Sequence, residues 1–202
     1  MPTLEEMFYL KEFQVKRLQE TYQDFMTQPI YESAGEFFFV ELYGPKDHTS
    51  RDQGFEFLHR HLSDKFGAKL IEDMGYLIEL NRLSNDLDQQ LYTELVKQFG
   101  KKNFRMEEYQ VAYLNCNNYD LRMKQIEGIH YAVETFYNLA KRPMVGLLLK
   151  SVSLTAKLIG AKHMIDFLRG GYEAFRCIPD IDPFQNALKE RELFFLNHIY
   201  KK

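Results

Sequence analysis

Two Glu-x-x-His motifs are the residues of this chain whose types and spacing best suit chemistry. Glu56 precedes His59 by three positions, and Glu127 precedes His130 by the same spacing. Residues three apart lie on one face of a helix, so each motif can direct a carboxylate and an imidazole to one metal ion. Helical bundles that hold two iron or two manganese ions use two such motifs and one further Glu from each of two other helices.

Glu41 and Glu79 could supply the further carboxylates, because one lies before the first motif and the other lies between the two. The competing interpretation is that the spacing arises by chance and that these side chains are solvated. The helix that holds Glu56 is also predicted to be too short for a long antiparallel bundle. The sequence therefore predicts no cofactor. The alternative is a di-iron or di-manganese centre built from Glu41, Glu56, His59, Glu79, Glu127 and His130.

A second group of polar residues surrounds a predicted helix-turn-helix corner. Gly44 and Pro45 should end one helix, since glycine suits a helix C-terminus and proline cannot continue it. In a structural interpretation Asp47 or Ser50 caps the next helix and Arg51 ties the corner to a carboxylate. In a functional interpretation the corner is a polar cleft in which Arg51 binds an anion. The candidate residues are Glu41, Tyr43, Asp47, Arg51 and Asp52.

Polar residues also crowd the helix predicted at residues 69–99, notably at Glu79, Asn81 and Asp86. Asn and Asp are weak helix formers, so their density requires a reason. Glu79 and Asp86 are seven positions apart and share a face. That face is either buried and paired with Arg176 or Arg51, or solvated. A structural role and a polar binding site both remain open.

Residues 141–163 contain five basic residues and no acidic one, in a chain whose net charge is −3. A basic amphipathic helix of this kind can lie on an anionic membrane or dock an acidic partner. Lys150 and Lys157 are the candidate contacts. The competing interpretation is a core helix with a solvated lysine face.

The elements that must position these residues are all predicted to be helices. Leucines at positions 77, 80, 83, 87, 91 and 95 recur at steps of three and four, which is typical of a helix, and no run alternates with a period of two. We expect a single all-α domain over residues 1–202, with seven or eight helices and no sheet. The expected helices span about 3–26, 31–43, 50–67, 69–99, 104–140 with an interruption at 115–118, 143–159, 162–176 and 182–199.

Composition excludes several classes of protein. The 202 residues include 17 Phe and 13 Tyr, which is too aromatic for a disordered chain. A net charge of −3 argues against nucleic-acid binding, which requires a basic surface. Only two cysteines are present, and neither a signal peptide nor a membrane-spanning run is evident, so we expect a cytoplasmic location.

A family resemblance begins at residues 37–45, Phe-Phe-Phe-Val-Glu-Leu-Tyr-Gly-Pro, which Asp47 and Arg51-Asp52 follow. These residues resemble the bacterial proteins named for an FFLEELY motif, and the likeness continues at 79–88, 109–113, 142–143 and 171–176. The chain differs at Phe39, where the family has Leu, and at Val40, where it has an acid. The resemblance implies an uncharacterised all-helical cytoplasmic protein without an assigned activity.

Nothing in the sequence predicts nucleophilic catalysis, since it contains no Gly-x-Ser-x-Gly elbow, phosphate-binding glycine loop or dinucleotide fingerprint. Our first hypothesis is a non-enzymatic protein-interaction or self-association module, with an unknown protein partner or a second copy of the chain bound at its surface. The alternatives are the di-metal bundle and a peripheral membrane protein that docks through residues 141–162.

Overall fold

A computed structural model describes residues 4–42, 44, 68–100, 103–156 and 162–201 of the chain. Within these residues the regular structure is entirely helical, which confirms the predicted all-α class. They form nine α-helices and one π-helical segment, η1. In chain order these are α1 (Leu4–Thr21), α2 (Gln23–Met26), α3 (Glu32–Glu36), η1 (Phe37–Leu42), α6 (Ala68–Phe99), α7 (Met106–Asn115), α8 (Tyr119–Ala140), α9 (Pro143–Ala156), α10 (Lys162–Arg176) and α11 (Asp182–Tyr200).

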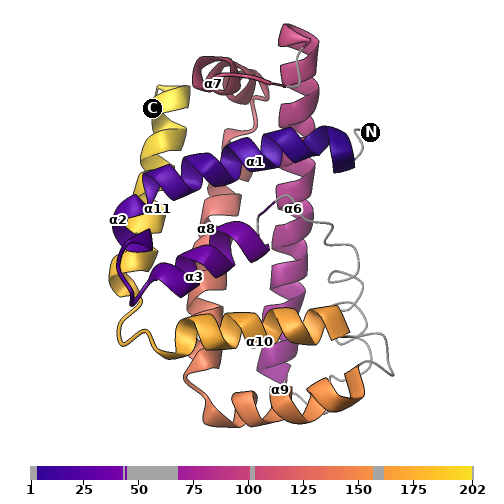
Figure 1. Cartoon of the computed structure of the whole chain (residues 1–202). Coiled ribbons are helices and arrows are strands. Elements are labelled where there is room, and N and C mark those ends of the chain that lie inside the picture. The colour runs from indigo at the N-terminus through magenta and orange to yellow at the C-terminus, as the bar shows by residue number, and fades with distance from the viewer. Residues whose placement is uncertain (1–3, 43, 45–67, 101–102, 157–161, 202) are drawn as a thin grey trace.

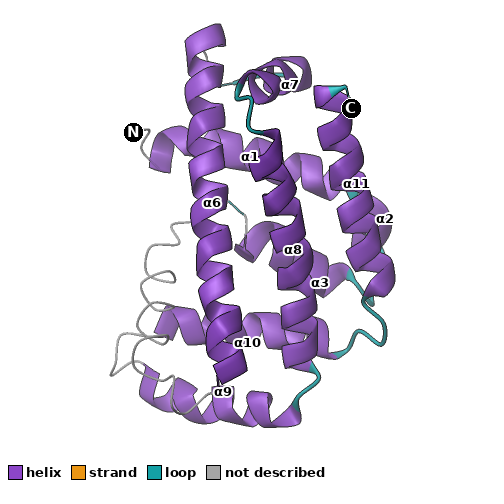
Figure 2. Cartoon of the chain, turned by 180° about the vertical axis from the view of Figure 1, so that it is seen from behind, coloured by secondary structure: helices purple, strands orange, loops and turns teal. Residues whose placement is uncertain are grey.

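The helices are arranged in two crossing layers. The long helices α6, α8 and α11 have roughly parallel axes, with α8 antiparallel to the other two, and α1, α3 and α10 cross them steeply on one side (Figure 1). The opposite view places α6, α8 and α11 in front of the crossing helices (Figure 2). Helix α9 lies at one end of the molecule and α7 at the other. None of the helices in the described part of the chain combines the length and the apolar character that crossing a bilayer requires.

Several predicted helix boundaries are confirmed and two differ, while the helix predicted at 50–67 lies outside the described residues. The predicted helices at 69–99, 162–176 and 182–199 are present, and residues 116–118 do interrupt the helix predicted at 104–140. The first helix was expected to continue to Met26, but it ends at Thr21, and Tyr22 separates it from α2. The helix predicted to begin at residue 104 begins at Met106, with Arg105 as its N-cap, and the backbone N–H of Arg105 donates to Glu108 Oε2 at 2.9 Å.

The break after α1 has a tertiary cause. The Tyr22 ring is fully buried, and its single O–H proton is shared between two acceptors, the carbonyl of Leu188 at 3.2 Å and Glu192 Oε1 at 3.0 Å. Its backbone leaves the helical region, at φ −112° and ψ 21°. The contacts with α11 thus fix a bend that local helix propensity does not predict.

The helix predicted at 31–43 is an α-helix that widens into a π-helix. Widened turns of this kind are rare and often lie at functional sites. Phe37, Phe38 and Phe39 are consecutive within it, and each is at most 4% exposed. The rings of Phe37 and Phe136 contact edge to face at 5.2 Å, and those of Phe39 and Tyr22 stack at 5.1 Å. The segment therefore packs its aromatic side chains against helix α8 and against the bend at Tyr22.

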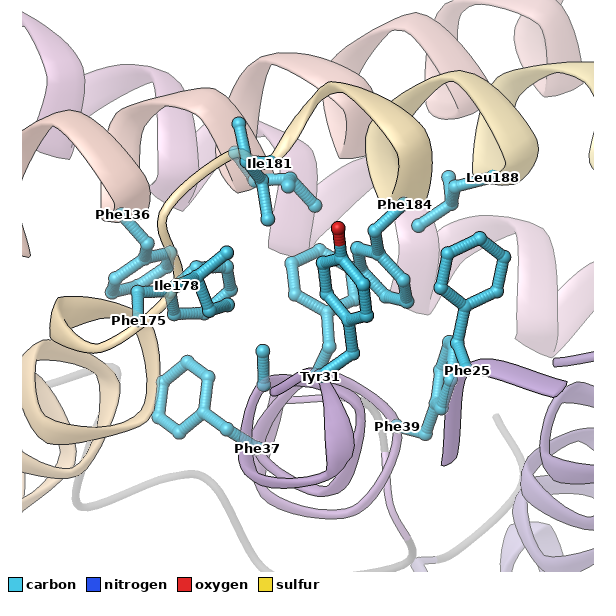
Figure 3. Close-up of a cluster of buried hydrophobic side chains, with 14 of the residues drawn as sticks. Phe25, Tyr31, Phe37, Phe39, Phe136, Phe175, Ile178, Ile181, Phe184 and Leu188 are labelled. Carbon is cyan, nitrogen blue, oxygen red and sulfur yellow. The ribbon is translucent and has the colours of Figure 1, made fainter. Parts of the chain in front are cut away.

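The core consists of two clusters of buried side chains. One contains the rings of Phe37, Phe136 and Phe175 near one end of α11, and those of Phe25 and Phe39 around Phe184 (Figure 3). The other surrounds Leu91, Tyr109 and Leu196 near the opposite end of α11. Helix α11 therefore belongs to both halves of the core.

A close approach of α10 to the aromatic cluster depends on glycine. A Cβ atom added at Gly171 would lie 2.8 Å from Phe37 Cζ and 2.9 Å from Phe136 Cδ1. A Cβ atom added at the neighbouring Gly170 would lie 3.7 Å from Phe37, an ordinary van der Waals distance. A Cβ atom added at Gly146 on α9 would likewise lie only 2.7 Å from Cζ of the Tyr172 ring.

Candidate functional site

The described ligands of the predicted metal centre are not clustered. Glu41, Glu79 and Glu127 are all exposed. Within the described residues no group of three or more His, Cys, Asp or Glu side chains could hold a metal ion. The other motif, Glu56 and His59, lies outside the described residues.

His130 is half-buried and interacts with an amide. Gln185 Nε2 lies 3.2 Å from its Nδ1 and also donates to its backbone carbonyl at 3.2 Å. Burial lowers the pKa of His130 below its usual value, nearby Lys189 lowers it further, and Glu134 partly opposes the shift. The imidazole is thus held in its neutral form by its surroundings.

The other predicted polar groups lie largely at the surface. Tyr43, Asp47, Arg51 and Asp52 of the corner lie outside the described residues, as does Lys157. On α6, Glu79 and Asp86 are exposed and Asn81 is half-buried. Arg176, a suggested partner of that face, pairs with Glu173 at 3.0 Å. Lys150 on α9 is exposed.

The structure contains an internal cavity that the sequence did not predict. It has a volume of about 60 Å³ and lies where α1, η1, α7, α8 and α11 meet. Leu18, Phe38, Phe39, Ile129 and Leu188 provide apolar walls. The polar groups that line it are Gln14, Arg17, Tyr109, Tyr113, Arg122, Gln125 and Glu192.

An ion pair between α1 and α11 forms one wall of this cavity. Arg17 Nη1 and Nη2 donate to the two carboxylate oxygens of Glu192 at 3.1 and 2.7 Å, and the guanidinium lies 4.5 Å from the Phe195 ring centre. Both side chains are nearly buried, at 12% and 13% exposed. Burial alone would lower the pKa of Arg17, but the charge and hydrogen bonds of Glu192 outweigh it and raise that pKa. The pair therefore stays ionised.

A second set of polar groups joins α1, α6 and α8. Gln14 Nε2 donates to Asp88 Oδ1 at 3.0 Å, and both residues are at most 2% exposed. Arg122 donates to Gln125 Oε1 at 3.0 Å and to the carbonyl of Leu87 at 3.2 Å. Its guanidinium also lies 4.4 Å from the centre of the Tyr113 ring.

Two of the buried polar atoms around the cavity have no hydrogen-bond partner. They are Oε1 of Gln14, an acceptor, and Nε of Arg17, a donor. An unsatisfied buried group costs about 1–3 kcal/mol, so both atoms favour a guest in the cavity. Burial also raises the pKa of Tyr109 and of Tyr113, so their hydroxyls keep their protons at neutral pH. The cavity is thus equipped to hold a polar guest by hydrogen bonds.

The sequence carried one signal for this buried polar cluster. The apolar face of α1 includes Met7, Leu10 and Leu18, and Gln14 and Arg17 occupy the same face between Leu10 and Leu18. Polar residues in the gap of an apolar stripe indicate a buried polar contact.

The outer face of α11 is the second candidate site. Glu190, Phe194 and His198 are exposed at steps of four residues, and Phe194 is 75% exposed. The rings of Phe194 and His198 stack at 6.3 Å. An open hollow of about 490 Å³ adjoins this face between α1 and α11. It is lined by Arg17, Thr21, Glu190, Arg191, Phe194 and Phe195.

The walls of the hollow are held in place by ionic contacts. Arg191 donates from Nη1 and Nη2 to the two carboxylate oxygens of Asp24, at 2.7 Å each, and to the carbonyl of Thr21 at 2.7 Å. Its guanidinium lies 5.4 Å from the ring centres of Tyr22 and Phe25. The hollow and the exposed Phe194 side chain beside it therefore form a preorganised surface.

Comparison with curated proteins and with solved structures gave no match to this chain. A family model does match, over residues 2–202, and its description is Domain of unknown function (DUF8198). Because this match covers nearly the whole chain, the chain belongs to that uncharacterised family.

Proposed function

We propose that this protein is a non-enzymatic, cytoplasmic self-association module that pairs with a second copy of itself through the outer face of α11. The observation that carries the proposal is the exposed series Glu190, Phe194 and His198 beside the hollow between α1 and α11. A projecting aromatic side chain and an apolar hollow in one patch make that patch complementary to itself. Self-complementarity is what a two-fold symmetric interface requires.

The polar groups on this face suit an antiparallel pair of α11 helices. If a two-fold axis passes near Phe194, residues at equal distances before and after it face each other across the interface. Glu190 of one copy then faces His198 of the second, and each Phe194 side chain enters the opposite hollow. An aromatic anchor that fills a pocket, with charged groups at its rim, is the usual composition of a strong interface.

Sedimentation equilibrium of the full chain at micromolar concentrations tests this proposal. The wild type should form dimers, and Phe194→Ser should weaken dimerisation at least about tenfold. Leu147→Ser is the matched control, because Leu147 is 68% exposed on α9, away from this face. A monomeric wild type, or an equal effect of the two variants, would overturn the proposal.

A charge exchange tests the orientation of the two helices. Glu190→Lys should weaken the dimer, because the lysine cannot accept the hydrogen bond that the Glu190 carboxylate can accept from a histidine ring N–H. The double variant Glu190→Lys/His198→Glu should recover it, because a lysine and a carboxylate then face each other. Circular dichroism on each variant verifies that the fold is intact. Failure of the double variant to recover dimerisation would reject the antiparallel pairing.

A second function is favoured by a different observation, on α9. Met144 is 80% exposed and Leu147 68% exposed, and both lie beside the exposed cations Arg142 and Lys150. Apolar and basic side chains together suit the surface of an anionic bilayer. Vesicles rich in phosphatidylserine should carry the wild type upward in a flotation gradient at low salt, and Lys150→Glu should reduce this. No flotation of the wild type would reject the function.

Three predictions from the sequence are still predictions. The resemblance to FFLEELY-motif proteins and a bacterial origin stay predictions. The di-metal alternative also stays one, since Glu56 and His59 lie outside the described residues. Protein purified without chelators should contain stoichiometric iron or manganese if the alternative is correct, and its absence in elemental analysis would reject it.

A further inference from the structure

We infer that the internal cavity is a binding site for a small neutral molecule with a hydrogen-bond donor and acceptor at one end and a short alkyl group at the other, such as a primary amide. The inference rests on the unpartnered atoms, the charge and the apolar walls of the cavity. It is independent of the self-association proposed above.

The polar end of such a guest is specified by two atoms. Gln14 is 2% exposed and lines the cavity, and its Oε1 has no hydrogen-bond partner. Arg17 lines the same cavity, and its Nε is likewise without a partner. A primary amide complements both atoms, since its N–H can donate to Gln14 and its carbonyl can accept from Arg17.

The charges around the cavity favour a neutral guest. Arg17 is balanced by Glu192, which binds it through both carboxylate oxygens. Arg122 also lines the cavity, and Asp88 lies behind Gln14 as the acceptor of its side-chain amide. Two positive and two negative side chains leave no net charge for an ion to neutralise. A carboxylate would also lie in the same cavity as Glu192, at a cost in burying an unbalanced charge.

The size and the apolar walls limit the rest of the guest. A volume of about 60 Å³ accommodates about four to six water-sized units, because each needs roughly 10–15 Å³. Leu18, Phe38 and Leu188 are among the apolar side chains that surround this space. A guest with a short alkyl group would contact them, and Arg17 offers a route of entry because it also lines the outer hollow.

Titration of the full chain with propionamide tests the inference, with the Arg17 Nε–H and Gln14 side-chain amide signals followed by NMR. Both signals should shift saturably with millimolar affinity, which is expected of so small a ligand. Propionate, which has the same shape and a negative charge, should leave them unshifted. No saturable shift with propionamide, or an equal response to propionate, would overturn the inference.

A cavity-filling variant provides a second test. Leu18→Phe places a larger side chain against the cavity and should weaken propionamide binding at least about tenfold. Leu193→Phe is the matched control, because Leu193 packs at the edge of the other core cluster and does not line the cavity. Leu193→Phe should bind as the wild type does. Undiminished binding by a folded Leu18→Phe variant would place the ligand elsewhere and reject the site.

Discussion

Two adjacent glycines of α10, Gly170 and Gly171, should respond in opposite directions to the same substitution. Alanine is favoured over glycine inside a helix by about 1 kcal/mol, and this gain applies equally to both positions. At Gly170 the new methyl group would meet Phe37 at 3.7 Å, so the gain is retained. Gly170→Ala should therefore stabilise the protein by about 0.5–1 kcal/mol.

At Gly171 the same methyl group would lie 2.8 Å from Phe37 and 2.9 Å from Phe136. These rings have little freedom to move, since Phe136 is 1% exposed and also contacts Phe167 and Phe175. Overpacking a tight core costs about 1–3 kcal/mol, which exceeds the helix gain. Gly171→Ala should thus destabilise the protein by up to about 2 kcal/mol.

Urea unfolding followed by circular dichroism measures both effects. The two variants share one helix and the same change in the unfolded chain, so the difference between their unfolding free energies isolates the contact with the rings. A difference of about 1–3 kcal/mol is expected. If Gly171→Ala proves as stable as Gly170→Ala, the close packing of α10 on the aromatic cluster is refuted.

Three further predictions concern buried charge, pH and thiol reactivity. Glu192→Gln should lower the unfolding free energy by about 3 kcal/mol, because it leaves the Arg17 guanidinium buried without its counter-charge. Urea unfolding measures this change, and a loss of less than about 1 kcal/mol would contradict the prediction. Since burial lowers the pKa of His130 in the folded state, the unfolded chain binds the proton more tightly and stability should fall as the pH decreases below 6.5. His130→Gln should reduce that fall between pH 7 and 5, and an unchanged slope would reject the reasoning. Cys177 is exposed, whereas Cys116 is half-buried and burial raises the pKa of its thiol. Iodoacetamide should therefore modify Cys177 first, as measured by peptide mass spectrometry. Equal rates of modification of the two cysteines would contradict the burial of Cys116.

The helices that the sequence predicted best are those whose signals are local. The leucines of α6 recur at helical spacing over its whole length, and Asp182-Pro183 is a good helix start for α11. The bend at Tyr22 could not be predicted in the same way, because it depends on contacts with Leu188 and Glu192, more than 160 residues away. The widened turn of η1 likewise has no known local signature in its residues.

The internal cavity was missed because polar residues are normally expected at the surface. Arg122 on α8 is only 2% exposed, although nothing near it in the sequence indicates burial. In the crowded polar stretch of α6 the buried residue is Asp88, and Asn81, Ser84 and Asn85 are half-buried. Ser84 accepts a hydrogen bond from Gln125 at 3.0 Å. Glu79 and Asp86, which the spacing emphasised, are exposed. Which side of a polar helix is buried depends on the neighbouring helices.

The position of α11 in both halves of the core has a consequence for biosynthesis. A nascent chain that ends before Asp182 has no Phe184 to pack on Tyr31 and no Leu196 to cover the cluster around Tyr109. Earlier helices can form on the ribosome, but their apolar faces stay open to water until this helix emerges. Newly made protein should therefore remain sensitive to proteases until the whole of α11 has left the ribosome, and then become resistant in one cooperative step.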